Sequence, residues 1–225
     1  NPTWIALREA FCQARDDDSI RCVLLTGAGE NFSSGVDLAS FADVAEGDEH
    51  PFDSAARAVA DFNKPLVAAA QGVAVGGGAT VLFHADIVYV GLSLRMRLPF
   101  ASLGLPPEWA SSYMLQSNIG SQRAAELFYT AQWIDAELAV RYGMAAASFP
   151  DGELLDVATR KVKEIAKWPA SALCEIKRCL RAPHAESIDR AFKLEAEAME
   201  KLAGSPDNIE AISAIFEKRD PAFSR

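Results

Sequence analysis

The feature that most constrains this chain is a run of three glycines, Gly76-Gly77-Gly78, set between two apolar segments. Glycine costs roughly 1 kcal/mol relative to alanine inside a helix, so three in succession suit an ordinary core poorly. They favour a backbone that adopts positive φ or comes close to something bound. If a helix begins there, its free N–H groups can bind an anion or a developing oxyanion. Close helix–strand packing alone explains the triplet equally well.

The composition predicts one globular α/β domain. The chain has 225 residues, half of them apolar and 24% charged, with a formal net charge of −9. This acidic balance argues against nucleic acid or an anionic membrane as the main partner, although it permits a small anionic ligand. No uninterrupted apolar run reaches the roughly 20 residues that a membrane span needs.

The cysteines and the first residues bear on location. The four cysteines lack metal-type spacing, so we expect no metal site and a reduced, cytoplasmic setting. No signal peptide is visible. The chain nevertheless opens at Asn1-Pro2, directly before an amphipathic helix. We therefore expect that a preceding segment is missing, which leaves organellar targeting open.

The first half of the chain, residues 1–105, alternates between helical and strand patterns. Apolar residues recur at helical spacing from Trp4 to Ala14, and short apolar runs predict buried strands. The expected strands are 22–26, 66–70, 87–90 and 95–98, and the expected helices after the first are 52–62 and 79–84. This alternation predicts a mostly parallel sheet.

The second half, residues 106–225, is predicted to be nearly all helical. Asp135 and Asp151 are plausible N-caps, and Gly143 is a plausible residue just past a helix end. The expected helices are 109–118, 121–129, 135–142, 152–167, 171–180, 185–202 and 206–217.

Two long segments carry a resemblance to a known family. TGAGENFSSGVDL at 26–38 and KPLVAAAQGVAVGGG at 64–78 resemble the signatures TGxGxxFSxGxDL and KPxIAAxxGxxxGGG of the crotonase (enoyl-CoA hydratase/isomerase) superfamily. The resemblance implies the crotonase (ClpP-like) fold, an α/β fold of repeated ββα units that form a mostly parallel sheet, with a helical C-terminal region. It places a core domain at 1–160, lacking its first strands, and a helical oligomerisation region at 161–225.

The resemblance also implies a ligand and a site. The substrate would be an acyl-CoA thioester, with coenzyme A as part of the substrate and no separate cofactor. The N–H groups of Val36 and Gly77 would form an oxyanion hole for the thioester oxygen. The residues implied in substrate or CoA binding are Gly35, Asp37, Leu38, Gly76, Phe100 and Lys177. For Asp37 a helix cap, and for Lys177 a solvated helix face, are the alternatives.

The acid–base residue is where this sequence departs from the hydratases of the family. Their two catalytic glutamates map to Thr80 and Phe100, neither of which can activate water. Instead LGLPPEWASSY at 103–113 resembles the LGxxPExxSSY motif of peroxisomal-type 3-enoyl-CoA to 2-enoyl-CoA isomerases, whose base maps to Glu108. Leu105 and Trp109 would supply an apolar wall that raises the carboxyl pKa. The alternative is that Glu108 merely occupies the first turn of the next helix.

The implied activity is an isomerase of fatty acid β-oxidation that moves a double bond from C3 to C2 of an acyl-CoA. Two alternatives stay open: an enoyl-CoA hydratase-like or other crotonase-type enzyme, including a ring-modifying isomerase, and a non-catalytic acyl-CoA-binding member. The resemblance further implies a homotrimer or a hexamer built as a dimer of trimers. His84 lies in an apolar run and is interpreted as a packed or surface residue.

Overall fold

The structure is a computed structural model that describes residues 2–37 and 50–223. Its first half alternates helices and strands, as the apolar patterns predict. The elements are α1 (Pro2–Asp16), β1 (Val23–Thr26), α2 (Pro51–Ala60), β2 (Leu66–Ala70), β3 (Val73–Val75), α3 (Gly77–Thr80), the 3-10 helix η2 (Val81–His84), β4 (Ile87–Gly91), β5 (Arg95–Arg97) and the 3-10 helix η3 (Ala101–Leu103).

The second half is dominated by helices. Its elements are α4 (Ser111–Ile119), α5 (Ser121–Thr130), β6 (Trp133–Asp135), α6 (Ala136–Tyr142), β7 (Ala147–Phe149), α7 (Asp151–Ile165), α8 (Ala170–Arg181), the 3-10 helix η4 (Ala182–His184), α9 (Ala185–Leu202) and α10 (Pro206–Glu217).

The strands form two sheets, and the mostly parallel arrangement is confirmed. One sheet has the order β1-β2-β4-β7 with every pair parallel. The other has the order β3-β5-β6, in which β3 and β5 are parallel and β6 runs antiparallel to β5. Two residues separate the end of β2 from the start of β3, so the chain passes directly from one sheet to the other just before the glycines.

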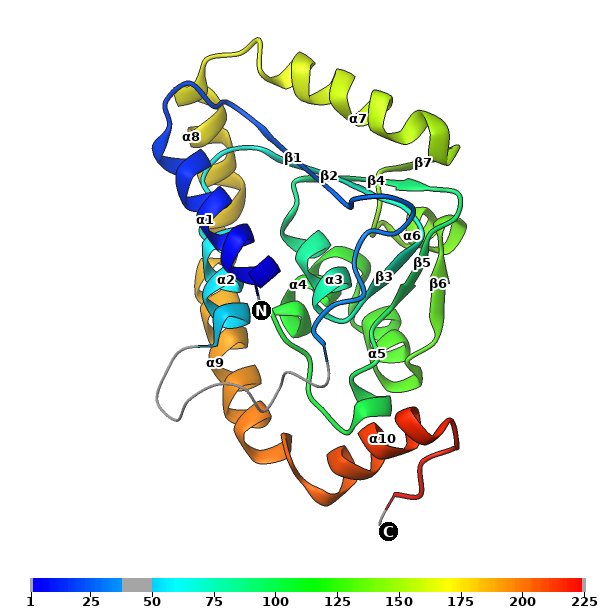
Figure 1. Cartoon of the computed structure of the whole chain (residues 1–225). Coiled ribbons are helices and arrows are strands. Elements are labelled where there is room, and N and C mark those ends of the chain that lie inside the picture. The colour runs from blue at the N-terminus through cyan, green and yellow to red at the C-terminus, as the bar shows by residue number, and fades with distance from the viewer. Residues whose placement is uncertain (1, 38–49, 224–225) are drawn as a thin grey trace.

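The central strand β2 shows how the layers are built. All five of its residues are buried, as expected of a parallel strand covered on both faces. Ala68 and Ala70 face the main core, whereas Ala69 packs with Leu154 and Ala158 of α7. Helix α7 accordingly runs along the outer face of this sheet (Figure 1).

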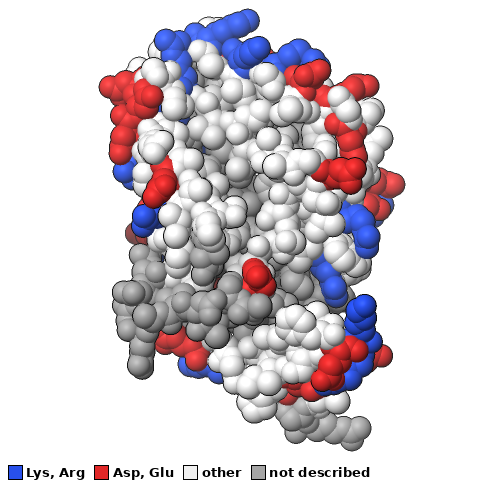
Figure 2. All heavy atoms as spheres, in the orientation of Figure 1, with Lys and Arg blue, Asp and Glu red and all other residues white. Residues whose placement is uncertain are grey.

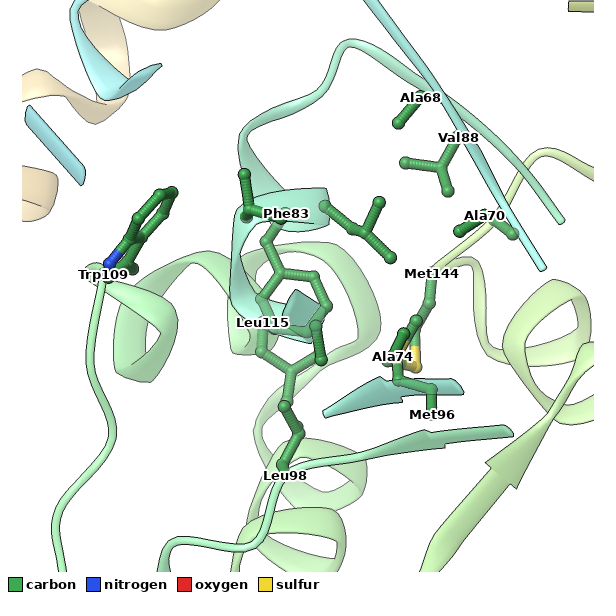
Figure 3. Packing of buried hydrophobic residues seen from close by; sticks show 14 of the residues in the cluster. Ala68, Ala70, Ala74, Phe83, Val88, Met96, Leu98, Trp109, Leu115 and Met144 are labelled. Atoms are coloured by element: carbon green, nitrogen blue, oxygen red, sulfur yellow. The ribbon is translucent and has the colours of Figure 1, made fainter. Parts of the chain in front are cut away.

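The main core lies between the two sheets and the helices around α3. Figure 3 shows Phe83 and Leu115 close together in this space, with Ala70 and Met144 on one side and Leu98 below. Trp109 lies apart from this group, where the chain turns into α4 (Figure 3). Trp109 belongs to the same core cluster and packs against Trp4 and Phe52, so the core continues past the turn that carries Glu108 toward α1 and α2.

Several predictions for the second half need correction. β6 and β7 were not predicted, because three-residue strands are too short to show an alternating pattern. Asp135 caps α6 as predicted, accepting the N–H of Leu138, and Gly143 ends that helix with a φ of 84°. Asp151 is not an N-cap: Pro150 holds that position, and Asp151 Oδ1 accepts the N–H of Ser93 instead.

The described surface offers two further observations. None of the described helices combines the length and the apolar character needed to cross a membrane. On the side seen in Figure 2, basic side chains lie along the top edge and acidic and basic side chains mix down both sides, while the centre is mostly uncharged. The described part of this face thus lacks the continuous basic surface typical of nucleic-acid binding.

Candidate active site

The glycine triplet forms the junction between β3 and α3. Gly76 has a φ of 52° and donates its N–H to the carbonyl of Arg97, and the helix begins at Gly77. The N–H of Gly77 has no acceptor among the described residues, as expected for the first residue of a helix. Because α3 has only four residues, the local N–H group rather than a long helix dipole supplies the positive potential here.

The close packing expected at the triplet is present. A Cβ on Gly77 would lie 2.5 Å from Phe52 Cε2, and a Cβ on Gly78 would lie 2.4 Å from the carbonyl oxygen of Ser33. A side chain at either position would clash. The glycines therefore allow close packing and leave a free backbone donor at the same turn.

A second loop crosses this junction and brings Val36 to it. Hydrogen bonds of 3.0 Å join Ser33 to Val73 and Val75 of β3. Gly35 follows with a φ of 85°, and a Cβ on it would lie 2.5 Å from the Val75 carbonyl oxygen and 3.3 Å from Gly77 N. The next residue, Val36, likewise has no acceptor for its N–H among the described residues. Two backbone donors thus come from loops in direct contact.

Glu108 is held by an unusual turn. The N–H of Ser111 donates to the Glu108 carbonyl oxygen over 3.0 Å. The two residues between them, Trp109 and Ala110, have φ values of 59° and 52°. Positive φ at both central positions is typical of a type I′ turn, which ordinarily uses glycine, asparagine or aspartate. Non-glycine residues in such conformations cost about 1–3 kcal/mol each and gather at functional sites.

The side chain of Glu108 faces the glycine turn. A Cβ on Gly76 would lie 3.9 Å from Glu108 Oε1, in ordinary van der Waals contact. Aromatic rings stand beside it: Trp109 packs against Trp4 and Phe52, with ring centroids 5.6 and 5.3 Å away. Leu105 and Trp109 line cavities that Glu108 also lines, so the predicted apolar wall is present, and Phe52 of α2 adds to it. The motif did not reveal Phe52, or Trp4 of α1, which packs on Trp109.

The setting of Glu108 shifts its acidity in the direction that general-base chemistry needs. Burial raises the pKa of its carboxyl to about 8, and the negative charges of Glu195 and Asp53 add to the shift. The residue still keeps part of its surface open to the cavities that it lines. A base whose pKa lies near neutral pH combines a useful ionised fraction with good proton affinity.

Two neighbouring cavities meet at Glu108. The smaller, of about 280 Å³, is lined by Val36, Gly76, Gly77, Phe100 and Glu108, together with Leu103, Leu105, Met199 and others. The larger, of about 420 Å³, shares Val36, Glu108 and Met199 and adds Phe52, Trp109 and Phe192. Five residues predicted from separate motifs thus line a single cavity.

The remaining predicted residues do not join this group. Leu38 lies outside the described residues, and Asp37 is exposed. Thr80, at the position of a family glutamate, is fully buried and lines neither of the two cavities.

Lys177 requires a correction, because its side chain is buried and not on a solvated helix face. Its side chain is 4% exposed. The ammonium donates to the carbonyl oxygen of Lys64 and to Asp86 Oδ2, each over 2.9 Å. Asp86 also accepts the N–H of Leu66, so the ion pair ties α8 to the start of β2. Lys177 therefore has a structural role.

His84 is a packed residue, as interpreted from the sequence. It is 1% exposed, and its Nε2 lies 2.7 Å from the Trp109 carbonyl oxygen. Burial lowers its pKa to about 4, so the ring is neutral and Nε2 acts as the donor. Within residues 2–37 and 50–223, no group of three or more His, Cys, Asp or Glu side chains could hold a metal ion.

The sequence reasoning missed the contribution of α9. Glu195 and Met199 of this helix line the larger cavity, and Glu195 bonds to the backbone beside Glu108. A signal was available: Ile188, Ala191 and Glu195 follow at spacings of three and four residues, which puts a carboxylate on the buried stripe of the helix.

Comparisons with known proteins agree with this arrangement. The model of the enoyl-CoA hydratase/isomerase family matches residues 3–225. The chain belongs to this family. The fold and superfamily expected from the two signatures are therefore confirmed, and the family is one of acyl-CoA hydratases and isomerases.

Individual relatives of this family member differ in their activities. This chain is 33% identical to the 1,2-epoxyphenylacetyl-CoA isomerase of Escherichia coli, and the match covers 97% of this chain and 86% of the relative. It is 32% identical to the carnitinyl-CoA dehydratase of Proteus mirabilis, over 96% and 85%. The crystal structure of an enoyl-CoA hydratase/isomerase from Pseudoalteromonas atlantica superposes with a TM-score of 0.94 at 32% identity, covering 98% of this chain and 88% of that one.

Proposed function

We propose that this protein is an enoyl-CoA isomerase that converts a 3-enoyl-CoA to the 2-enoyl-CoA through an enolate. The observation that carries this proposal is the cavity where Glu108 meets Val36 and Gly77. Among the described residues that line it, Glu108 is the only acidic one. One base opposite two backbone donors is what a proton shift next to a thioester requires.

In the proposed mechanism, the thioester oxygen accepts hydrogen bonds from the N–H groups of Val36 and Gly77. Glu108, in its ionised form, removes a proton from C2. The negative charge develops on the thioester oxygen, where each backbone donor can contribute about 3–4 kcal/mol of stabilisation. The protonated Glu108 then returns the proton to C4, and the double bond moves to C2. One carboxyl can serve both carbons when both protons lie on one face of the bound chain.

The residues at the two hydratase positions support isomerisation over water addition. Phe100 is 5% exposed and lines the cavity where a glutamate would activate water. Thr80, at the other position, is completely buried. The cavity thus presents an apolar ring in place of a carboxylate, which disfavours the binding of a nucleophilic water.

A second candidate is isomerisation of an acyl-CoA that carries a ring. Two observations favour it: one relative is a 1,2-epoxyphenylacetyl-CoA isomerase, and the larger cavity beside Glu108 is lined by the aromatic residues Phe52, Trp109 and Phe192. Because both reactions would use Glu108, which lines both cavities, the choice between the two candidates depends on the acyl group.

The test is to incubate the protein separately with 3-hexenoyl-CoA, 2-hexenoyl-CoA and 1,2-epoxyphenylacetyl-CoA, and to separate the products by retention time and mass. We expect 3-hexenoyl-CoA to give an isomer of equal mass and 2-hexenoyl-CoA to gain no water. A gain of one water by 2-hexenoyl-CoA would overturn the interpretation of Phe100 and Thr80. Turnover of the epoxide alone would select the second candidate, and binding of all three without turnover would favour a non-catalytic member.

A further inference from the structure

The turn that follows Glu108 is held by hydrogen bonds to a side chain that lies far away in the sequence. Glu195, in the middle of α9, is 6% exposed. Its Oε2 accepts the N–H of Ala110 over 2.7 Å, and its Oε1 accepts the N–H of Ser112 over 2.8 Å. Both oxygens of one buried carboxylate are thus occupied by backbone donors that lie two and four residues after Glu108.

The two hydrogen bonds from Glu195 take the place of the side-chain cap that Ala110 cannot provide for α4. Ala110 occupies the N-cap position of α4 in a left-handed conformation and has no side-chain acceptor. The first N–H groups of a helix need acceptors, and a negative charge at this end is favourable. Glu195 supplies the acceptors and the negative charge from α9. It thereby stabilises the positive φ values of Trp109 and Ala110, which are costly for residues other than glycine.

We propose that Glu195 is the positioning residue of Glu108, whose carboxylate holds the turn that aims the base at the bound acyl group. This inference rests on the proposed function, because it takes Glu108 to be the base. Glu195 does not touch the reacting atoms in this account. It acts through the backbone of residues 109–112, together with His84, which donates a hydrogen bond to the Trp109 carbonyl oxygen.

Glu195 also acts on Glu108 through its charge. After burial itself, the negative charge of Glu195 is the largest cause that raises the pKa of Glu108. The other charged or titratable described residues that line the two cavities are Asp53 and Arg57 of α2, His50 just before it, Glu200 of α9 and Arg97 of β5, and the neutral His84 lies behind Trp109. Arg57 is paired with Asp189 over 3.0 Å, which diminishes its effect on the carboxylates.

Two variants separate the geometric role from the electrostatic one. Glu195→Gln keeps the shape but removes the charge and turns an amide donor toward one backbone N–H. Glu195→Asp keeps the charge but is one methylene too short to reach both N–H groups. The matched control is Glu197→Gln, which makes the same charge change on the exposed face of the same helix.

The first readout is the pKa of the Glu108 carboxyl, measured by an NMR titration of protein that carries carbon-13 in its glutamate side chains. The Glu108 signal is assigned as the one that is missing in Glu108→Gln. This readout needs no turnover, so it is informative even if the proposed function fails. We expect the pKa of Glu108 to fall by roughly one unit in Glu195→Gln and to stay in place in Glu195→Asp and Glu197→Gln.

The second readout is kcat for 3-hexenoyl-CoA, which we expect to fall between about 10-fold and 100-fold in both Glu195 variants, because small displacements of a catalytic group are costly. A lowered kcat with an unmoved Glu108 titration in Glu195→Gln would make Glu195 merely structural and overturn the proposal. Wild-type values of both quantities in Glu195→Gln would overturn it too. If Glu195→Gln does not fold, Glu195→Asp decides by comparing kcat with KM: a reduced kcat at an unchanged KM supports the proposal, whereas an unchanged kcat, or a fall in kcat that KM shares, contradicts it.

Discussion

At the scale of single residues, the raised pKa of the Glu108 carboxyl suits a general base but makes the stability of the fold depend on pH. Burial and two negative neighbours raise its pKa to about 8, so the folded protein holds this proton more tightly than the unfolded chain does. A carboxyl with a raised pKa stabilises the fold only while it is protonated. Its contribution is complete below the ordinary glutamate pKa and is lost as the pH rises through about 8.

This linkage predicts how Glu108→Gln changes stability with pH. Glutamine is a neutral isostere, so it avoids the cost of ionising the buried group. We expect the melting temperature of Glu108→Gln, relative to the wild type, to be higher near pH 9 than near pH 5, because the wild-type carboxyl ionises between these values. Differential scanning calorimetry at both pH values measures this.

The control for that experiment is Glu126→Gln, which removes an exposed carboxylate from α5. The difference between this variant and the wild type should stay nearly constant over the same pH range. A constant difference for Glu108→Gln as well would contradict the assigned burial of its carboxyl.

Single residues also show where prediction from sequence reached its limit. Glu108 was found because its motif is local and its neighbours in sequence are also its neighbours in space. The burial of Lys177 was not predicted because its partners, Lys64 and Asp86, are far away in sequence, and helical spacing alone does not reveal a buried ion pair. A lysine at such a position shows its role only when the tertiary contacts are known.

At the scale of elements, the site depends on two loops that cross with almost no space between them. Gly35 and Gly29 offer a matched comparison, because their φ values are 85° and 86°. A Cβ on Gly35 would lie 2.5 Å from the Val75 carbonyl oxygen, whereas a Cβ on Gly29 would meet nothing within 4 Å. Both positions therefore favour glycine because of their positive φ, but only Gly35 lies where the two loops cross.

We therefore expect Gly29→Ala to lower the free energy of unfolding by about 1 kcal/mol, the cost of a left-handed alanine. Gly35→Ala should cost at least about 2 kcal/mol more, because backbone must move to relieve the clash. It should also reduce turnover, since that movement displaces Val36 from Gly77. Urea denaturation measures both costs, and equal values for the two variants would contradict the close crossing.

Elements were predicted well where their pattern was long and poorly where it was short. The strand at 66–70 and the helix at 185–202 have the predicted bounds, because buried strands and amphipathic helices of this length show clear periodicity. β6 and β7 span three residues each, and they form only because β5 and β4 offer partners. The carboxylate on the buried stripe of α9 was visible in the sequence, but its partner turn was not.

At the scale of the whole molecule, the C-terminal helices contribute directly to the candidate site. Met199 of α9 and Ile215 of α10 line the smaller cavity, and Asn208 of α10 donates to the Leu103 carbonyl oxygen at its edge. Residues 161–225 therefore help to form the cavity within one chain. Exposed apolar side chains remain on α9, α10 and the segment after it, including Leu194, Phe216 and Phe223. The predicted trimer or hexamer stays a prediction.

The proposed isomerisation depends on Glu108 acting as the base in a cavity that it shares with the backbone donors of Val36 and Gly77. The most direct measurement is kcat of Glu108→Gln with 3-hexenoyl-CoA near pH 8, beside the affinity of the same variant for a saturated acyl-CoA. We predict that kcat falls by about 10²- to 10⁴-fold, the usual contribution of a general base, while the affinity stays close to that of the wild type. Turnover within a few-fold of the wild type would contradict the account.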